Sequence, residues 1–492
     1  MITWGISALS HDAALAVFDD NKILFASHAE RFSGRKNDSQ LSTGLINYAL
    51  RYGYPQEVYW YENPLLKSLR QLRAGQGWMY KENSPNDCLA AHNIYTPIYI
   101  QSHHHSHAAA GYYTSGFDNA TVVVIDAIGE FETFTVWKGD GNKLEKVYTQ
   151  SYPHSIGLWY SAMTQRIGLK PNEEEYILMG MAAYGDADKY YDVIKNTFFK
   201  SNSNKKVKFK RNLHRGCSWF MPDEQALDYT DEPTKWAFDI AAGTQAVYEN
   251  LLTDIMSQVH KEWPSDNLVF MGGCALNCKA NTRLHDYWKN IWIMPNPGDA
   301  GSAIGAVLAN KGGHIEWPGP YLGYDINREF KLDKIIKELQ KTGIVGVANG
   351  KAEFGPRALG NRSLLADPRG IDVRSRVNKI KQRQEFRPFA PAILEEYADQ
   401  YFDGPSNRYM QFTSQCRDPE SYPGIVHKDG SSRVQTVGPN DNKNLRQLLE
   451  RWYELTGCPM LLNTSLNIKG EPMVNDILDA ARFSRRYSVE VL

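Results

Sequence analysis

Two stretches of the chain decide its fold class: LVFMGGCALN at 268–277 and WIMPNPGDAGSAIGAVLAN at 292–310. Each begins as an apolar strand, passes through a glycine turn and continues as a helix. Glycine allows close backbone approach, and a helix N-terminus offers unpaired N–H donors to phosphate oxygens. The pattern predicts an α/β fold with nucleotide-binding loops that contain Gly272, Gly273, Asn277, Gly298 and Gly301.

Two further segments, 2–18 and 121–129, combine predicted buried strands with polar ends. Residues 2–7 and 13–18 are short apolar runs joined by the polar Ser10, His11 and Asp12, which predicts a hairpin that presents its turn to solvent. The apolar run 121–125 ends at Asp126, with Gly129 close behind. Functional carboxylates favour such positions, where a buried strand emerges into a loop.

The bulk composition is typical of a globular protein of two or three domains. The chain has 492 residues, of which 42% are hydrophobic and 23% charged. No apolar run approaches the roughly 18 residues of a membrane span, and the N-terminus lacks the features of a signal peptide. Six scattered cysteines predict reduced thiols and a cytoplasmic location. Cys274 and Cys278 are interpreted as core thiols, with a metal half-site as the alternative.

The domain boundary is predicted in the glycine- and proline-rich stretch 312–324, GGHIEWPGPYLGY. It gives a first domain at 1–320 and a second at 328–492, which opens with a helical pattern at 332–342. Basic residues then gather around apolar segments: Arg357, Arg362, Lys379, Lys381, Arg383 and Arg387. This concentration predicts that the second domain binds an anion.

The net charge of −1 gives no global argument for nucleic acid or membrane, so polyanion binding would depend on local clusters. One cluster comprises Lys67, Arg70, Arg73 and Lys81. The other runs from Lys200 to Arg215 and holds seven basic residues and no acidic one. Each is interpreted as a solvated surface, with polyanion binding as the alternative.

A metal site is predicted from four residues. The segment QSHHHSHAAA at 101–110 suits a helix, on which His103 and His107 share one face about a turn apart. His104 and His105 then point elsewhere. Asp126 and Asp299 add two carboxylates, each after a buried strand and before a glycine-containing loop. Two imidazoles and two carboxylates with open positions favour iron(II), with manganese or zinc as alternatives.

Together with these residues, an ordered series of motifs resembles the O-carbamoyltransferases of the nodulation and aminoglycoside-antibiotic type. The first half contributes SHDAA at 10–14, HHHSHAAA at 103–110, VVVIDAIGE at 122–130, LMGMAAYG at 178–185, GGCALN at 272–277 and NPGDAGSAIGA at 296–306. The second half contributes EFGPRALGNRS at 353–363, FRPFAP at 386–391, RVQTV at 433–437 and LNTSLNIKGEP at 462–472. Several of these motifs are weak alone, but their order is specific.

The resemblance implies a front domain like the actin-type ATPases, akin to threonylcarbamoyl-transferring enzymes, and a smaller α/β rear domain that forms carbamoyl adenylate from carbamoyl phosphate and ATP. The front domain would then pass the carbamoyl group to an acceptor hydroxyl, with His11 as the base. Magnesium would accompany ATP. The residues that resemble the carbamoyl phosphate and adenylate pocket are Arg357, Lys381, Arg387, Arg433, Asn467 and Lys469. Lys469 stands where many relatives carry arginine, so its phosphate contact would lack bidentate geometry.

Two other functions compete with this interpretation: a tRNA threonylcarbamoyl-type transferase and a non-enzymatic actin-like ATPase or nucleotide sensor. The first receives its adenylate from a separate protein, whereas this chain carries both sets of motifs. The second needs neither the histidine pair nor an arginine-rich second domain. For the acceptor, both a small sugar-like molecule and a hydroxymethylated pyrimidine in DNA, such as 5-hydroxymethylcytosine, remain open. No membrane and no obligate protein partner is expected.

Overall fold

The computed structural model describes residues 1–200, 207–222 and 233–492. It divides into two compact units: a front unit of Met1–Ser33 and Asn37–Pro318, and a rear unit of Gly34–Lys36 and Gly319–Leu492. The division at Pro318 falls inside the glycine- and proline-rich stretch 312–324. Within the described ranges, no helix combines the length and apolar character that a bilayer span requires.

The front unit contains two five-stranded sheets. The first has the order β3-β2-β1-β4-β5, and the second has the order β8-β7-β6-β9-β10. The strands of the first are β1 (Ile2–Ser7), β2 (Ala14–Asp19), β3 (Lys22–His28), β4 (Glu57–Trp60) and β5 (Ile98–Ile100). Those of the second are β6 (Asn119–Gly129), β7 (Glu132–Asp140), β8 (Lys143–Ser151), β9 (Asn267–Met271) and β10 (Asn290–Trp292).

The two sheets share one topology. In each, three strands form an antiparallel meander, and two more strands are added parallel to the first strand of that meander. This duplicated order is the topology of the actin-like ATPases, which confirms the predicted fold class. The predicted hairpin is also present, with Ser7 paired to Ala14 across β1 and β2. Parallel strands end at the same edge of a sheet, so the loops after them gather side chains there.

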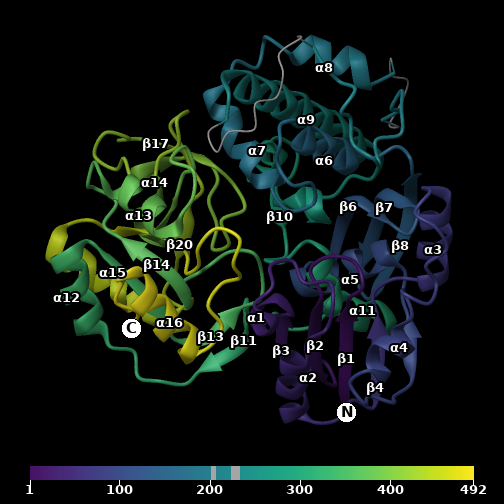
Figure 1. Cartoon of the computed structure of the whole chain (residues 1–492), viewed down its shortest axis with the longest axis horizontal. Helices are drawn as coiled ribbons and strands as arrows, with labels where there is room; N and C mark the ends of the chain where they lie inside the picture. The colour runs from purple at the N-terminus through teal and green to yellow at the C-terminus, as the bar shows by residue number, and fades with distance from the viewer. Residues whose placement is uncertain (201–206, 223–232) are drawn as a thin grey trace. The chain divides into compact units, whose positions relative to one another are not determined.

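Some helices of the front unit pack on these sheets, and others pack on those helices (Figure 1). They include α1 (Glu30–Ser33), α2 (Thr43–Ala49), α3 (Pro64–Arg73), α4 (Pro85–Ala90), α5 (His103–Ser115), α6 (Ile156–Arg166), α7 (Glu175–Met181), α8 (Tyr191–Phe198), α9 (Lys235–Glu262), α10 (Cys278–Asn281) and α11 (Ser302–Lys311). After β9, the predicted helix is only a 3-10 turn at Gly273–Leu276 followed by the four-residue α10. The helix predicted at 303–310 is α11.

Helices α5 and α11 pack against each other at a glycine. A Cβ atom on Gly305 would lie 1.8 Å from the carbonyl oxygen of Ser106, so only glycine permits this approach. Ser106 lies between His103 and His107 on α5, and Asp299 immediately precedes α11. The tight crossing therefore brings the start of α11 to the two imidazoles.

The rear unit has its own hydrophobic core around a sheet of order β12-β14-β20-β15-β19. These strands are β12 (Ile344–Ala348), β14 (Arg362–Ala366), β20 (Met460–Ser465), β15 (Ala390–Leu394) and β19 (Gln435–Val437). Smaller sheets contain β11 (Tyr321–Ile326), β13 (Gly350–Glu353), β16 (Phe402–Asp403), β17 (Ser414–Cys416) and β18 (Ser431–Ser432). Its helices include α12 (Leu332–Thr342), α13 (Val373–Lys381), α14 (Ala398–Tyr401), α15 (Lys443–Thr456) and α16 (Ile477–Tyr487).

Candidate functional site

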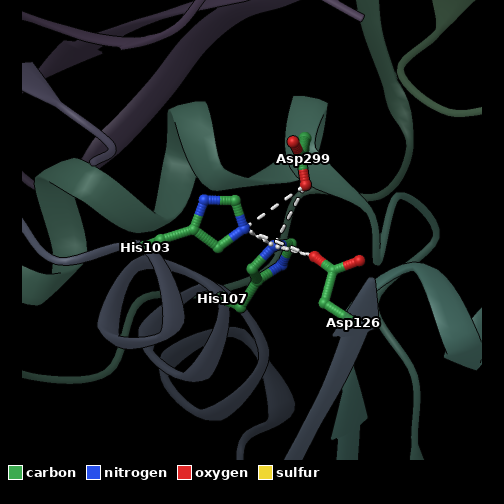
Figure 2. Close-up of side chains that lie close together, drawn as sticks. All are labelled: His103, His107, Asp126 and Asp299. Atoms are coloured by element: carbon green, nitrogen blue, oxygen red, sulfur yellow. Dashed lines mark hydrogen bonds and ion pairs between the residues drawn. The ribbon is translucent and has the colours of Figure 1, made fainter. Parts of the chain in front are cut away.

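Four buried side chains of the front unit converge on one point: His103, His107, Asp126 and Asp299. Their nearest nitrogen and carboxylate oxygen atoms all lie within 4.8 Å of one another. The two Nε2 atoms are 3.2 Å apart, and each lies 3.2–3.5 Å from an oxygen of either aspartate. Figure 2 shows the four side chains pointing toward one another from α5, from β6 and from the turn before α11.

Local structure fixes the position of each of these side chains. Helix α5 places the two imidazoles on one face at i, i+4 spacing. The Oδ1 atom of Asp126 accepts hydrogen bonds from Ala127 N at 2.7 Å and Gly273 N at 3.4 Å, which leaves Oδ2 toward the histidines. A Cβ atom on Gly129 would lie 2.2 Å from Cδ2 of His103, so this glycine gives the imidazole ring its space.

The electrostatics of the cluster favour a bound cation. Burial and the charge of Asp299 favour the neutral acid of Asp126, but hydrogen bonds from His103 and His107 outweigh them and lower its pKa. Burial opposes charge on His103, but Asp299 and Asp126 outweigh it and raise its pKa well above the usual value. The Nε2 atoms of His103 and His107 are in contact, so at most one of them can donate a hydrogen bond to the other. A divalent cation satisfies both nitrogens and both carboxylates, so the donor set fits one.

His11 lies beside this cluster. Its Nε2 atom is 3.8 Å from Asp299 Oδ2, and its Nδ1 atom is 3.1 Å from Asp12 Oδ2. Asn37 donates to the other oxygen of Asp12 at 3.0 Å, which fixes that carboxylate. Burial lowers the pKa of His11, but Asp299 and Asp12 raise it to about 10. Without a cation these carboxylates favour the protonated imidazole, and a cation bound by Asp299 would offset that effect and favour the neutral ring that can act as a base.

The other histidines of the HHHSH motif have different neighbours. The Nδ1 atom of His104 lies 2.9 Å from Thr135 Oγ1, and the ring is buried. His105 stacks on Trp137 with ring centroids 5.2 Å apart. Both rings point away from the aspartates, as the helical spacing predicts.

Residues of the predicted nucleotide loops have several roles in the structure. Gly272 has a φ of 92°, and a Cβ atom there would lie 2.2 Å from Ile125 O. Gly301 makes a similar close approach to Asn296 O, whereas Gly298 faces open space. Asn277 caps α10 and exchanges two hydrogen bonds with Gln245, at 3.0 and 3.1 Å. Thus Gly272 and Gly301 serve the backbone path, whereas a Cβ atom at Gly298 would meet no atom within 4 Å.

In the rear unit, the structure gathers three of the predicted anion-binding residues. The ammonium group of Lys381 is buried and donates to Asn467 Oδ1 at 2.9 Å and to Asn467 O at 3.0 Å. It also contacts the carbonyl oxygen of Ser465. Burial, followed by the charges of Arg383 and Arg387, lowers the pKa of Lys381 well below its usual value. The donors of Lys381 thus go to Ser465 and Asn467. The neighbouring guanidinium groups of Arg383 and Arg387 supply the positive charge that suits an anion.

The remaining predicted residues lie on neighbouring loops of the same unit. Gln435 donates to Leu359 O at 3.2 Å, which ties the strand after Arg433 to the loop of Arg357. Lys469 is exposed, and its backbone N–H donates to the carbonyl oxygen of Lys381 at 2.9 Å. The side chain of Lys469 therefore has room to move, while its backbone fixes the end of α13.

Arg362 departs from the anion-binding interpretation. Its guanidinium is fully buried and donates to backbone carbonyls on several segments. The acceptors are the carbonyl oxygens of Tyr324, Asn349, Gly350, Asn361 and Asn475. Arg362 thus holds the backbone together. Glu353 completes the loop, because its Oε1 atom accepts hydrogen bonds from three backbone N–H groups at Leu359, Asn361 and Arg362.

Two residues of the first basic cluster differ from expectation. Lys67 and Arg70 are buried in the front unit, at 3% and 8% exposed, so they belong neither to a solvated surface nor to a polyanion site. In the second cluster, Lys205 and Lys206 lie outside the described residues. Lys208 and Lys210 are exposed.

The sequence did not point to Glu62, which lies next to His103 of the four-residue cluster and pairs with Lys67. The available signal was its position two residues beyond the end of β4, but one carboxylate there is unspecific.

Two family models match this chain, one within the front unit and one within the rear unit. Residues 70–308 match the carbamoyltransferase N-terminus family model, and residues 336–492 match the carbamoyltransferase C-terminus model. The chain is 34% identical to an uncharacterized protein of Synechocystis sp., over 99% of this chain and 95% of the relative. It is 29% identical to nodulation protein NolNO of Sinorhizobium fredii, over 96% and 76%.

A further relative is the 3'-hydroxymethylcephem-O-carbamoyltransferase of Amycolatopsis lactamdurans. The identity is 26%, over 95% of this chain and 94% of the relative. The two family models together cover most of the chain in the order that the motifs predict. The chain belongs to the O-carbamoyltransferase family.

Proposed function

We propose that this protein activates carbamoyl phosphate with ATP as carbamoyl adenylate and transfers the carbamoyl group to an acceptor hydroxyl. The observation that carries the proposal is the presence of both carbamoyltransferase domains in one chain. The converging histidines and aspartates of the front unit support it. The charges of Arg383 and Arg387 beside Lys381 in the rear unit support it as well.

In the rear unit, we assign Arg357, Lys381, Arg387, Arg433, Asn467 and Lys469 to carbamoyl phosphate and the adenylate. Arginine and lysine neutralise the phosphate oxygens, and the Asn467 amide orients the planar carbamoyl head. Water releases phosphate from carbamoyl phosphate, and the resulting carbamate oxygen attacks the α-phosphorus of ATP. The bond to pyrophosphate breaks, which leaves carbamoyl adenylate.

In the front unit, we assign Gly272, Gly273, Asn277, Gly298 and Gly301 to the loops that receive the nucleotide. His103, His107, Asp126 and Asp299 would hold a divalent cation, for which iron(II) is our first choice. When bound, it supplies a Lewis acid for oxygens of the adenylate.

The transfer step uses His11 and its neighbours. The acceptor oxygen attacks the carbonyl carbon of carbamoyl adenylate, the bond to the AMP phosphate breaks, and the hydroxyl proton passes to Nε2 of His11. Asp12 holds the opposite ring nitrogen, Nδ1, at 3.1 Å and so leaves Nε2 as the nitrogen that receives that proton.

The name of one relative supports a proposal for the acceptor class. One relative's name specifies transfer to a hydroxymethyl group, so we propose an alcohol of this kind as the acceptor. A small sugar-like molecule and a hydroxymethylated pyrimidine in DNA both present one. The burial of Lys67 and Arg70 removes two of the four residues of the first basic cluster that favoured DNA.

The proposal is tested with the purified full-length chain, ATP, Mg²⁺, iron(II) and carbamoyl phosphate. We expect pyrophosphate release that depends on carbamoyl phosphate. Adding a panel of sugar-like and hydroxymethylcytosine-containing DNA acceptors should yield a carbamoyl adduct by mass spectrometry. Absence of carbamoyl-phosphate-dependent pyrophosphate release would refute the activation step.

A further inference from the structure

Helix α3 has an orientation that its sequence does not favour. Its leucines face outward, with Leu65 at 47% and Leu72 at 51% exposed, whereas Lys67 is only 3% exposed. In water an amphipathic helix normally buries its apolar face. The polar side of α3 must therefore make specific contacts inside the front unit.

The main contact is an ion pair between Lys67 and Glu62. Both side chains are at least nine-tenths buried, and the ammonium group is bonded to Glu62 Oε1. It also donates to the carbonyl oxygen of Leu9 at 2.8 Å. Desolvation offsets most of the attraction in such a buried pair, so the pair is weak evidence for stability alone. Another role has to account for it.

The second oxygen of Glu62 faces the metal cluster. Oε2 lies 3.6 Å from Nδ1 of His103. That nitrogen is buried and, among the described residues, has no hydrogen-bond partner. The opposite nitrogen, Nε2, lies toward Asp126 and Asp299. An ionised carboxylate beside Nδ1 favours the tautomer that carries its proton there, which leaves the Nε2 lone pair for a cation.

We propose that Glu62 is a positioning residue that fixes the ring orientation and tautomer of His103, and that Lys67 holds the Glu62 side chain in place. This inference rests on the proposed metal centre. His107 serves as an internal contrast. Its Nδ1 atom is also buried without a hydrogen bond in the described ranges, and no carboxylate of those ranges is paired with that nitrogen. The two histidines are thus supported differently.

The test measures binding of Co²⁺ alone to the metal-free full-length chain, by titration and by the visible absorption of the bound ion. The variants are Glu62→Gln and the double variant Glu62→Gln/Lys67→Met, which removes both buried charges. The matched control is Glu132→Gln/Lys146→Met, because Glu132 and Lys146 form a more exposed pair on β7 and β8. Thermal melting is recorded for every protein.

We expect Glu62→Gln to weaken Co²⁺ binding by roughly 10- to 100-fold and to alter the absorption spectrum. The double variant should melt close to wild type and still bind Co²⁺ weakly, which separates positioning from stability. The control pair should bind Co²⁺ normally. A double variant with wild-type affinity and spectrum would overturn the inference. Failure of the wild-type chain to bind Co²⁺ would instead overturn the metal centre itself, and the inference with it.

Discussion

The two sheets of the front unit share a strand order but contribute different chemistry at equivalent strand ends. The segment after β5 begins α5 with His103, and the segment after β10 carries Asp299. The loop after β1 holds His11, whereas the end of β6 holds Asp126. The first half therefore supplies imidazoles, and the second half supplies carboxylates.

The shared topology therefore determines where side chains of the two halves meet. The residue types at those points determine which chemical groups are present there. Neither half holds the complete ligand set. The close crossing of α5 and α11 at Gly305 joins the two half-sites. Removing a ligand from either half should therefore have the same consequence.

The largest effect is expected from removing a ligand. His103→Ala and His107→Ala, from the first half, and Asp126→Ala, from the second, should each lose bound metal together with transfer activity. We expect losses on the order of 100-fold or more, because ligands matter at least as much as their supporting residues. Elemental analysis and the transfer assay measure the two quantities. Stoichiometric metal in the His103→Ala/His107→Ala double variant would contradict the shared site.

The next effect separates the two units. Arg387→Ala should abolish carbamoyl-phosphate-dependent pyrophosphate release, because it removes a cation beside Lys381. His11→Ala should leave that half-reaction intact and slow only transfer, by roughly 100-fold or more for loss of a general base. Both half-reactions are followed in each variant. Equal loss of the pyrophosphate half-reaction in both variants would rule out two separate sites.

A smaller effect is expected from Gly129, a residue of the second half that contacts His103 of the first half. Gly129 ends β6 and packs on His103, so a methyl group in Gly129→Ala would collide with the imidazole. Displacement of the ring should weaken metal binding by about 10-fold. Gly180→Ala on α7 is the matched control, since a Cβ atom there meets no atom within 4 Å. Unchanged Co²⁺ affinity in Gly129→Ala would show that the contact does not position His103.

The smallest effect concerns four lysines of the second basic cluster. Neutralising Lys205, Lys206, Lys208 and Lys210 should leave pyrophosphate release and transfer to small acceptors unchanged, because an uncharged ligand gains little from remote charges. If the acceptor is DNA, the log–log salt dependence of its affinity should fall by about one unit per lost phosphate contact. Wild-type salt dependence on a DNA substrate would show these lysines to be uninvolved.

Local patterns in the sequence predicted those features whose cause is local. The spacing of His103 and His107 needs only a helix, and Asp126 needs only the end of an apolar strand. The ordered motifs predicted the carbamoyltransferase family and the actin-like fold, and both are confirmed. The duplicated sheet escaped detection, because the two halves share strand order and hydrogen bonding but no visible sequence repeat.

The tertiary structure decided which charged residues are buried and which neighbours they have. By sequence, Lys67 belonged to a basic cluster and Arg362 to an anion site. In the structure, one pairs with Glu62, and the other donates to backbone carbonyls. The reason is physical: burial of a charge depends on partners brought together from distant segments. The sequence alone thus determined the family and predicted four candidate metal-ligating residues, and the packing of the front unit decided how those side chains converge.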